Sequence, residues 1–429
     1  MSEVKIRSYP AIGEKYYYCM HKSGLRIYLV PKKMSATYAV LGVKYGSICD
    51  KIDKKGRGII SIPDGTAHFL EHKMFENADG VDTFERFSSL GAQANAFTTF
   101  DLTAYLFSCT DNFEKALDVL LESVTSPFFT ESNVKKEQGI IAEEIRMGED
   151  NPGRTMMFAM LKSLYSSANV RKEIAGTVQS ISEITPEILY DCYDSFYNLN
   201  NMVLCVSGDE EMDAVLSSAD RVLKIAPPFD CDYPAPEEKE SVVAERTELS
   251  MRVASPLFTI GIKNSVISRD PHERLKESAA ISIIFDALFG KSSDFYNRAY
   301  EDGLLNGGLD IWDEHESSFS FVSLSGESCA PEKVYQRFLD TCSKSLANGL
   351  CEDDFIRTKR VFYAGIVSSF DSTEEIANNF LEYALAGVDP FDDIEAYASL
   401  DLEYVNEVMR KVFVPSHFNL TTVVPIKEN

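Results

Sequence analysis

Two of the six histidines in this 429-residue chain stand four positions apart, on either side of a glutamate. The stretch GTAHFLEHKMFEN, residues 65–77, holds His68, Glu71 and His72 in the order H-x-x-E-H. On a helix these side chains share one face, because residues four apart are separated by about one turn. Two imidazoles and a carboxylate are a common donor set for catalytic zinc, whose fourth position is left to water. Glu71 could accept a proton from that water as it attacks a peptide carbonyl.

A second helical stretch offers a further carboxylate. In VKKEQGIIAEEIRMGE, residues 134–149, Glu137 and Glu144 are nearly two turns apart and share a face, whereas Glu143 points to the opposite side and to solvent. A buried carboxylate needs a partner, and three residues predict that this region is buried: Ile140, Ile141 and Ile145. The alternative is an ordinary helix whose glutamates all face solvent, beside an H-x-x-E-H that is a coincidence of surface residues.

The elements that must position these side chains are strands and amphipathic helices. The motif helix is predicted to open near Asp64, which can cap it, and to pack through Ala67, Leu70 and Met74. Further helices are predicted at 111–124, 131–148, 272–289, 331–347 and 352–369, and strands at LRIYLVP, TAYLFSC and NMVLCVSG. Because their order is not strictly βαβ, the predicted fold is α/β of the α+β type, a mixed, largely antiparallel sheet packed with helices.

A proline-rich stretch followed by a charged run divides the chain into two halves. Residues 226–248 contain four prolines, which favours an exposed, extended linker. We therefore predict an N-terminal domain at 1–225 and a C-terminal domain at 249–429. The halves present their elements in the same order, and TESNVKKEQGIIAEEI aligns without a gap with CEDDFIRTKRVFYAGI. This match indicates an internal duplication, two homologous domains in tandem.

The duplication predicts a metal site in the first half alone. No H-x-x-E-H occurs in the second half, and the motif helix matches ISIIFDALF there. The matched residues in the second half are Ser282 for His68, Asp286 for His72, Thr358 for Glu137 and Gly365 for Glu144.

The bulk composition excludes several classes of partner. The formal charge of −25, from 67 acidic and 42 basic residues, repels nucleic acid and anionic membrane surfaces. It could favour basic peptides, or serve solubility alone. The start, MSEVKIRSYP, has no signal-peptide core, and no apolar run reaches membrane-spanning length. Nine scattered cysteines without a C-x-x-C pair predict buried, reduced thiols and a cytoplasmic location.

The order of these motifs resembles the M16 (pitrilysin/insulinase) family of zinc metallopeptidases. H-x-x-E-H followed by an E-x6-E helix is the pattern of these inverted zincins. ANAFTTFDLTAYLF, residues 94–107, is similar to the family's N-A-x-T…T-x-Y strand. GTAHFLEHKMFE, EQGIIAEEI and IAGTVQSISEIT resemble the YmfH-like bacterial branch.

This resemblance implies a LuxS/M16-type metallopeptidase fold and a zinc endopeptidase that holds a peptide in the cleft between two homologous domains. It also implies dimers, either homodimers or pairs with an M16-type paralogue. The implied roles are zinc ligands for His68, His72 and Glu144, general base for Glu71, supporting acid for Glu137, and peptide-binding edge strand for Asn95, Ala96 and Phe97.

One segment departs from the family pattern. Active relatives carry an R-x-x-x-G-L-x-Y type segment whose Arg and Tyr reach the substrate. Here NRAYEDGLLNGG has Ala299 at the Arg position and Asn306 at the Tyr position, with Arg298 and Tyr300 beside Ala299. Two other readings therefore stay open: a weakly active or scaffolding subunit of a two-chain M16 assembly, or a peptide-binding protein.

Overall fold

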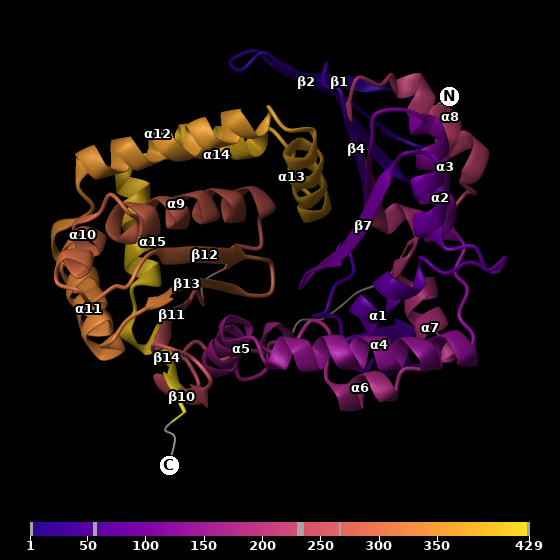
Figure 1. Cartoon of the computed structure of the whole chain (residues 1–429). Helices are drawn as coiled ribbons and strands as arrows, with labels where there is room; N and C mark the ends of the chain where they lie inside the picture. The colour runs from indigo at the N-terminus through magenta and orange to yellow at the C-terminus, as the bar shows by residue number, and fades with distance from the viewer. Residues whose placement is uncertain (1–2, 55–57, 230–235, 266, 427–429) are drawn as a thin grey trace. The chain divides into compact units, whose positions relative to one another are not determined.

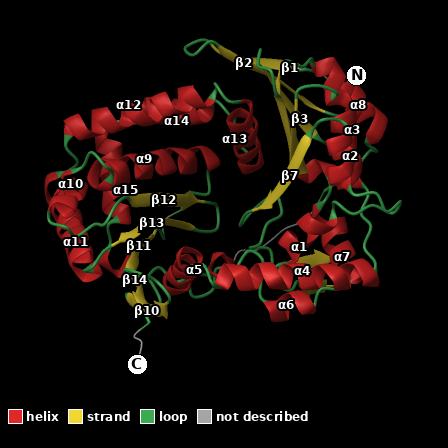
Figure 2. Ribbon diagram, viewed as in Figure 1, coloured by secondary structure: helices red, strands yellow, loops and turns green. Residues whose placement is uncertain are grey.

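The computed structural model describes residues 3–54, 58–229, 236–265 and 267–426. The chain forms two compact units, each of which contains a sheet packed with helices (Figure 2). The first unit comprises Met1–Ile145, Lys172–Pro234 and Val367–Pro390, and the second comprises Arg146–Arg171, Ala235–Ile366 and Phe391–Asn429. Each unit is thus assembled from both halves of the sequence.

The first unit is built on a mixed sheet with the strand order β1-β2-β3-β9-β4-β8-β7. Of these strands, β1, β2, β4 and β7 are labelled in Figure 1. β3 and β9 are parallel, and the other neighbouring pairs are antiparallel. β4 is buried along its whole length, as expected for a central apolar strand. The strands are β1 (Lys5–Tyr9), β2 (Glu14–Met20), β3 (Arg26–Pro31), β4 (Thr37–Val43), β7 (Gln93–Thr98), β8 (Thr103–Cys109) and β9 (Met202–Gly208), with a separate hairpin of β5 (Lys51–Lys54) and β6 (Gly58–Ser61).

The helices of the first unit surround this sheet. They are α1 (Thr66–Lys73), α2 (Thr83–Ser89), α3 (Phe113–Thr125), α4 (Glu131–Glu149), α6 (Val178–Ser182), α7 (Pro186–Phe196), α8 (Met212–Val222) and α13 (Thr373–Ala386). α1 packs against β7 and β8, so the motif helix is fixed to the edge of the sheet.

The second unit has a smaller sheet with the strand order β10-β14-β11-β13-β12. Its strands are β10 (Arg246–Met251), β11 (Leu257–Lys263), β12 (Leu309–His315), β13 (Ser320–Glu327) and β14 (Phe418–Pro425). Its helices are α5 (Pro152–Leu164), α9 (Pro271–Phe289), α10 (Asp294–Glu301), α11 (Pro331–Asn348), α12 (Glu352–Ser369), α14 (Asp392–Ser399) and α15 (Leu402–Val412).

The two sheets share one topology, which confirms two homologous domains. β3-β9-β4-β8-β7 and β10-β14-β11-β13-β12 have the same order and the same directions, with one parallel pair at the corresponding edge. The chain also passes from one unit to the other at matched points, after Ile145 in α4 and after Ile366 in α12. These two residues are partners in the gapless alignment of the halves.

Each unit receives one helix from the other half of the sequence. α13 packs on β3, β4 and β9, whereas α5 packs on β10, β11 and β14. A Cβ at Gly42 would lie 2.5 Å from Leu381 of α13, and one at Gly261 would lie 2.6 Å from Met160 of α5. Glycine therefore lets each helix approach its strand closely.

A lysine two residues after each of these glycines binds the end of the same helix. Lys44 Nζ donates to the carbonyl of Leu385 at 3.1 Å, and Lys263 Nζ donates to that of Leu164 at 3.0 Å. A cation stabilises the carbonyl end of a helix. In both units, a lysine of the sheet therefore holds the C-terminal end of the helix that comes from the other half of the sequence.

The predicted helices agree with the observed ones to within two residues. Some finer predictions are wrong. Ile140 is 47% exposed. Cys329 and Cys351 are exposed and Cys49 is partly exposed, whereas Cys19, Cys109, Cys192, Cys205 and Cys342 are buried. The predicted linker extends too far, because β10 begins at Arg246. Residues 230–235 of this linker, Cys231 included, lie outside the described part.

Within the described residues, no helix combines the length and apolar character that a membrane span requires.

Candidate metal centre

The motif helix α1 packs through its apolar face and begins at a glycine N-cap. Ala67, Leu70 and Met74 are buried, as predicted. Asp64 does not cap the helix, contrary to prediction, because its carboxylate binds Lys172 Nζ at 2.9 Å. The N-cap is Gly65, whose φ of 92° suits glycine and whose Cβ, if present, would lie 2.4 Å from the carbonyl of Ala175.

The structure brings together the three predicted metal ligands. His68 and His72 face the same side of α1, with ring centroids 4.6 Å apart. Across from them on α4, Glu144 Oε1 lies 3.5 Å from His68 Nε2, and its Oε2 lies 3.7 Å from His72 Nε2. One donor atom from each residue fits within a mutual separation of 4.8 Å, and all three residues are partly exposed.

These separations suit a zinc ion. Donors about 2.0–2.1 Å from a tetrahedral zinc lie about 3.3 Å from one another. The Nε2 atoms of His68 and His72 lie 3.5 Å and 3.7 Å from the nearer Glu144 oxygen, so small side-chain rotations bring the set to that distance. Two neutral imidazoles and one carboxylate also match the donor preference of zinc. Residues His68, His72 and Glu144 therefore fit the metal as a set, and their partial exposure leaves access for a fourth ligand.

Behind this triad, Glu137 orients one of the histidines. Glu137 is 6% exposed, and its Oε1 lies 3.0 Å from His72 Nδ1. When Nδ1 donates this hydrogen bond, Nε2 keeps its lone pair on the side of Glu144. Burial opposes the charged form of Glu137, but His72 and Lys73 outweigh it and hold the pKa below its ordinary value. For His72, burial is outweighed by the bond to Glu137 and by nearby carboxylates, so its pKa is raised.

Glu71 lies on the same helix but has a different environment. It is 8% exposed, and Thr98 Oγ1, at the end of β7, donates to its Oε2 at 2.5 Å. Burial raises the pKa of Glu71 above the ordinary value for a carboxyl, partly offset by Thr98 and His72. A carboxyl whose pKa is shifted towards neutrality suits a proton acceptor that later returns the proton.

Sequence reasoning did not single out Thr98 or Lys73. Thr98 directly follows the predicted peptide-binding residues, so the N-A-x-T pattern contained the signal. Lys73 directly follows the motif and is fully buried. Nothing in its sequence neighbourhood predicts this burial, since an isolated lysine after a polar motif is typical of a surface.

The predicted peptide-binding residues lie on β7, the last strand in the order of the first sheet. β7 pairs with β8 on one side, and Asn95 is exposed while Ala96 and Phe97 are partly exposed. The other edge of β7 makes no strand pairing among the described residues. An extended peptide can add to such an edge through main-chain hydrogen bonds.

The matched positions of the second unit hold no comparable set. Ser282 donates to Asp313, and burial raises the pKa of Asp286, an effect that Arg357 and Thr358 partly offset. Within the described ranges, the group formed by His68, His72 and Glu144 is the one set of His, Cys, Asp and Glu donors close enough to share an ion.

The segment that departs from the family pattern makes local contacts. Ala299 is fully buried in α10, and Asn306 donates to Glu327. Arg298 forms an ion pair with Asp294 at 3.2 Å, and Tyr300 stacks on Tyr296 with ring centroids 6.2 Å apart.

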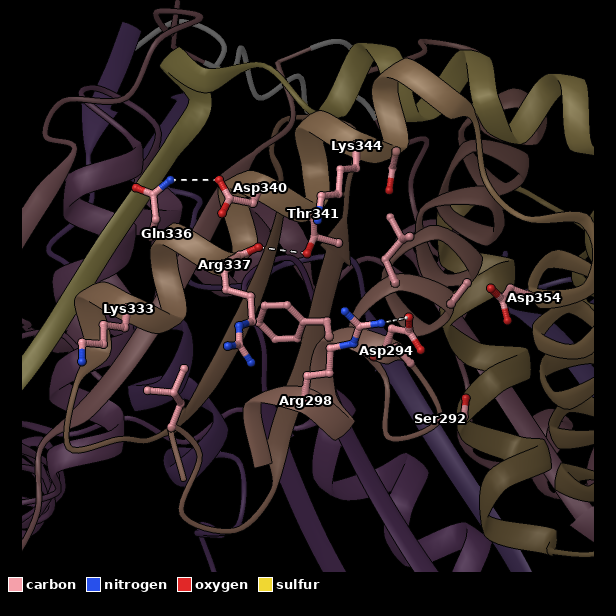
Figure 3. Close-up of a pocket in the computed structure, with 16 residues that line it drawn as sticks. Ser292, Asp294, Arg298, Lys333, Gln336, Arg337, Asp340, Thr341, Lys344 and Asp354 are labelled. Carbon is pink, nitrogen blue, oxygen red and sulfur yellow. Dashed lines mark hydrogen bonds and ion pairs between the residues drawn. The ribbon is translucent and has the colours of Figure 1, made fainter. Parts of the chain in front are cut away.

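A cavity of about 660 Å³ lies elsewhere, in the second unit, between the end of α9, α10 and α11. Figure 3 shows Arg298, Arg337 and Lys344 around it, with Asp294 and Asp340 as acidic neighbours. None of its lining residues belongs to the metal centre. It is a feature separate from the donor set described above.

A helix with H-x-x-E-H that shares a metal with a glutamate of a later helix is the arrangement of the inverted zincins. Comparisons with known proteins agree. The family description "Insulinase (Peptidase family M16)" matches residues 31–178, and "Peptidase M16 inactive domain" matches residues 183–362. The chain belongs to peptidase family M16.

The chain is similar to known proteins of similar length and to one that is longer. The "Uncharacterized zinc protease YmfH" of Bacillus subtilis strain 168 is 37% identical over 98% of this chain and 99% of its own length. A putative M16-like peptidase from Alicyclobacillus acidocaldarius has a TM-score of 0.93 at 30% identity, with 98% of this chain and 100% of that chain covered. Pitrilysin shares the fold, with a TM-score of 0.75 at 15% identity, over 97% of this chain and 45% of that one.

Proposed function

We propose that this protein is a zinc-dependent endopeptidase in which His68, His72 and Glu144 hold the metal and Glu71 acts as general base. The observation that carries the proposal is the convergence of the three donor residues beside a buried carboxylate of raised pKa. A peptide-binding protein would need no such base. Zinc, when bound, supplies a Lewis acid that polarises a carbonyl and lowers the pKa of a water.

The residues of the chain would carry out proton transfer, orientation of a metal ligand and binding of the substrate. Glu71 accepts the proton of the attacking water and delivers it to the leaving amine, while Thr98 holds one of its carboxylate oxygens. Glu137 supports His72 from behind. The exposed edge of β7, with Asn95, Ala96 and Phe97, binds the substrate as an additional strand. From the family resemblance, we propose that the peptide is held between the two homologous domains.

A second chain is part of this proposal. Ala299 and Asn306 stand where active relatives carry an Arg and a Tyr, and Asn306 is already bonded to Glu327. Such positioning of the substrate can lower the free-energy barrier of the reaction by several kcal/mol. We therefore propose a homodimer, or a heterodimer with an M16-type paralogue. The alternative, a weakly active or scaffolding subunit, predicts activity only in the mixture of the two chains.

We further propose a cytoplasmic location. The cysteines described by the structure are not joined in disulfides, which fits a reducing compartment.

The test of function compares the wild type with Glu71→Gln on a mixed peptide library, with and without a chelator, read by mass spectrometry. Glutamine keeps the size of the side chain but does not accept a proton at neutral pH. We expect about one zinc per chain in both proteins, and turnover lower by roughly 10²-fold or more in the mutant. Cleavage that survives both the mutation and the chelator would refute the proposed function.

A further inference from the structure

Lys73 is a fully buried lysine directly beside a metal ligand. Its side chain is 0% exposed, and lysine is almost never fully buried unless it is paired. The ammonium has three partners: it forms ion pairs with Glu76 Oε1 at 2.8 Å and Glu137 Oε2 at 3.5 Å, and it donates to the carbonyl of Asn133 at 3.4 Å. Its position is therefore determined by contacts with α4 and with Glu76, in the segment that follows α1.

The contact with Glu137 connects Lys73 to the metal ligands. Glu137 uses one oxygen for His72 Nδ1, at 3.0 Å, and presents the other to Lys73. The two contacts hold the carboxylate from both ends, so its plane has little freedom to rotate. His72 in turn directs Nε2 towards Glu144, 3.7 Å away. The series Lys73, Glu137, His72 is thus continuous in space.

Removal of Lys73 would change this series in a defined way. Glu137 is buried, and a buried carboxylate without a counter-charge is costly. The carboxylate would then gain by rotating towards water, and the bond that orients His72 would weaken. The same ammonium also donates to the carbonyl of Asn133 on α4, which fixes its place beside Glu137.

We propose that Lys73 is a positioning residue of the metal centre, which acts through Glu137 to hold His72 in its ligating orientation. The inference rests on the proposed zinc site, and it extends that site from its donors to a buried cation. Partners that orient metal ligands typically contribute 10–100-fold to metal affinity.

The test measures zinc affinity by competition with a chromophoric chelator, so no activity is required. Lys73→Met keeps an unbranched side chain of similar length and removes the charge. We expect the zinc Kd of the folded mutant to rise by about 10–100-fold. The matched control is Lys263→Met, which removes a lysine that is 1% exposed and bonded to Leu164, Lys239 and Glu238 in the second unit. The control should lose stability but keep the zinc Kd.

A double mutant distinguishes action through Glu137 from a general loss of packing. In a Glu137→Gln background, Lys73→Met should weaken zinc no further, since the residue through which it acts is already neutral. If Lys73→Met alone fails to fold, the zinc Kd of Glu137→Gln can still be compared with that of the double mutant, because the double mutant removes both buried charges together. An unchanged zinc Kd in folded Lys73→Met, or the same additional loss in the Glu137→Gln background, would overturn the inference.

The failure of this inference can be told from failure of the proposed function. If the wild type binds zinc and His68→Ala does not, the site is present, and only the role of Lys73 is then in question. If the wild type binds no zinc, the proposed function itself is wrong, and the inference is overturned with it.

Discussion

At the scale of single residues, three glutamates near two histidines have three different environments. The side chain of Glu144 is 43% exposed and faces both imidazoles, whereas Glu137 is buried and bonded to His72 and Lys73. Glu71 is buried and bonded to Thr98. These differences in burial and partners fit the three roles proposed for residues of the same type: ligand, orienting acid and base.

Thr98→Val tests the orientation of the base. The substitution keeps the branched shape and removes the hydroxyl that donates to Glu71. Hydrogen bonds to charged groups contribute about 1.5–3 kcal/mol, so we expect kcat/KM to fall by about tenfold or more. Zinc content should not change. Steady-state peptide cleavage is the measurement, and Thr99→Val is the control, because its hydroxyl bonds Asp101 and not Glu71. Equal activity in both variants would exclude this role for Thr98.

At the scale of elements, α1 and α4 form the site by presenting one face each. The period of α4 turns Glu137 and Glu144 towards α1 and leaves Glu143 exposed. The face is determined by its apolar residues, because Val134, Ile141 and Ile145 are buried beneath it.

Adjacent glutamates on α4 should therefore respond differently to alanine. Glu144→Ala removes a donor from the triad, and we expect zinc content to fall well below about one per chain. Glu143→Ala changes an exposed residue, and its zinc content and activity should match those of the wild type. Elemental analysis after dialysis measures this. The opposite pattern would mean that Glu143 and not Glu144 faces the histidines.

A second prediction at this scale concerns the segment before β10. Glu238 accepts hydrogen bonds from the backbone N–H groups of Ser166, Ser167 and Ala168 at 2.7–3.0 Å and pairs with Lys263 at 3.1 Å. Burial opposes its charged form, but these donors lower the pKa to about 2 from 4.5.

A lowered carboxyl pKa stabilises the folded state at pH values above the unfolded value, and this stabilisation is lost as the pH falls towards the folded value. Glu238→Gln should thus lower the free energy of unfolding by about 1–3 kcal/mol at pH 7. The difference from the wild type should shrink between about pH 5 and pH 3. Urea unfolding across this range provides the measurement. A difference that stays constant with pH would show that the charge of Glu238 does not contribute.

At the scale of the whole molecule, the duplicated halves are interlocked. α13 comes from the second half of the sequence and covers β3, β4 and β9, while α5 comes from the first half and covers β10, β11 and β14. Each sheet is therefore covered by a helix from the other half of the sequence. If the chain were cut between its halves, each sheet would lose that helix.

Separate expression of the two halves tests this interlocking. A fragment of residues 1–234 lacks α13, so the close packing of Leu381 on Gly42 and the bond from Lys44 to Leu385 are lost. We expect this fragment to unfold with a broad transition and a lower m-value than the intact chain. Addition of the fragment 236–429 should restore a cooperative transition. An isolated first fragment that unfolds at the midpoint of the whole protein would contradict the prediction.

The sequence by itself determined the features that depend on local periodicity. Residues four or seven apart share a helix face, so the spacing places His68 with His72 and Glu137 with Glu144, and the pattern of apolar residues locates the helices. The likeness of the two halves likewise predicts two sheets of one topology. Each of these inferences needs only neighbouring residues or the comparison of two stretches. The choice of Glu144 as the expected ligand comes from the family resemblance.

The tertiary structure decided what depends on residues distant in the sequence. Asp64 binds Lys172 and so leaves the N-cap to Gly65, and Lys73 is buried because Asn133 and Glu137 of α4 cover it. The exchange of α5 and α13 follows from packing between segments that belong to different halves of the chain. The burial of polar side chains such as Lys73 and the pairing of charges distant in the sequence are properties of the assembled core, and no local pattern contains them.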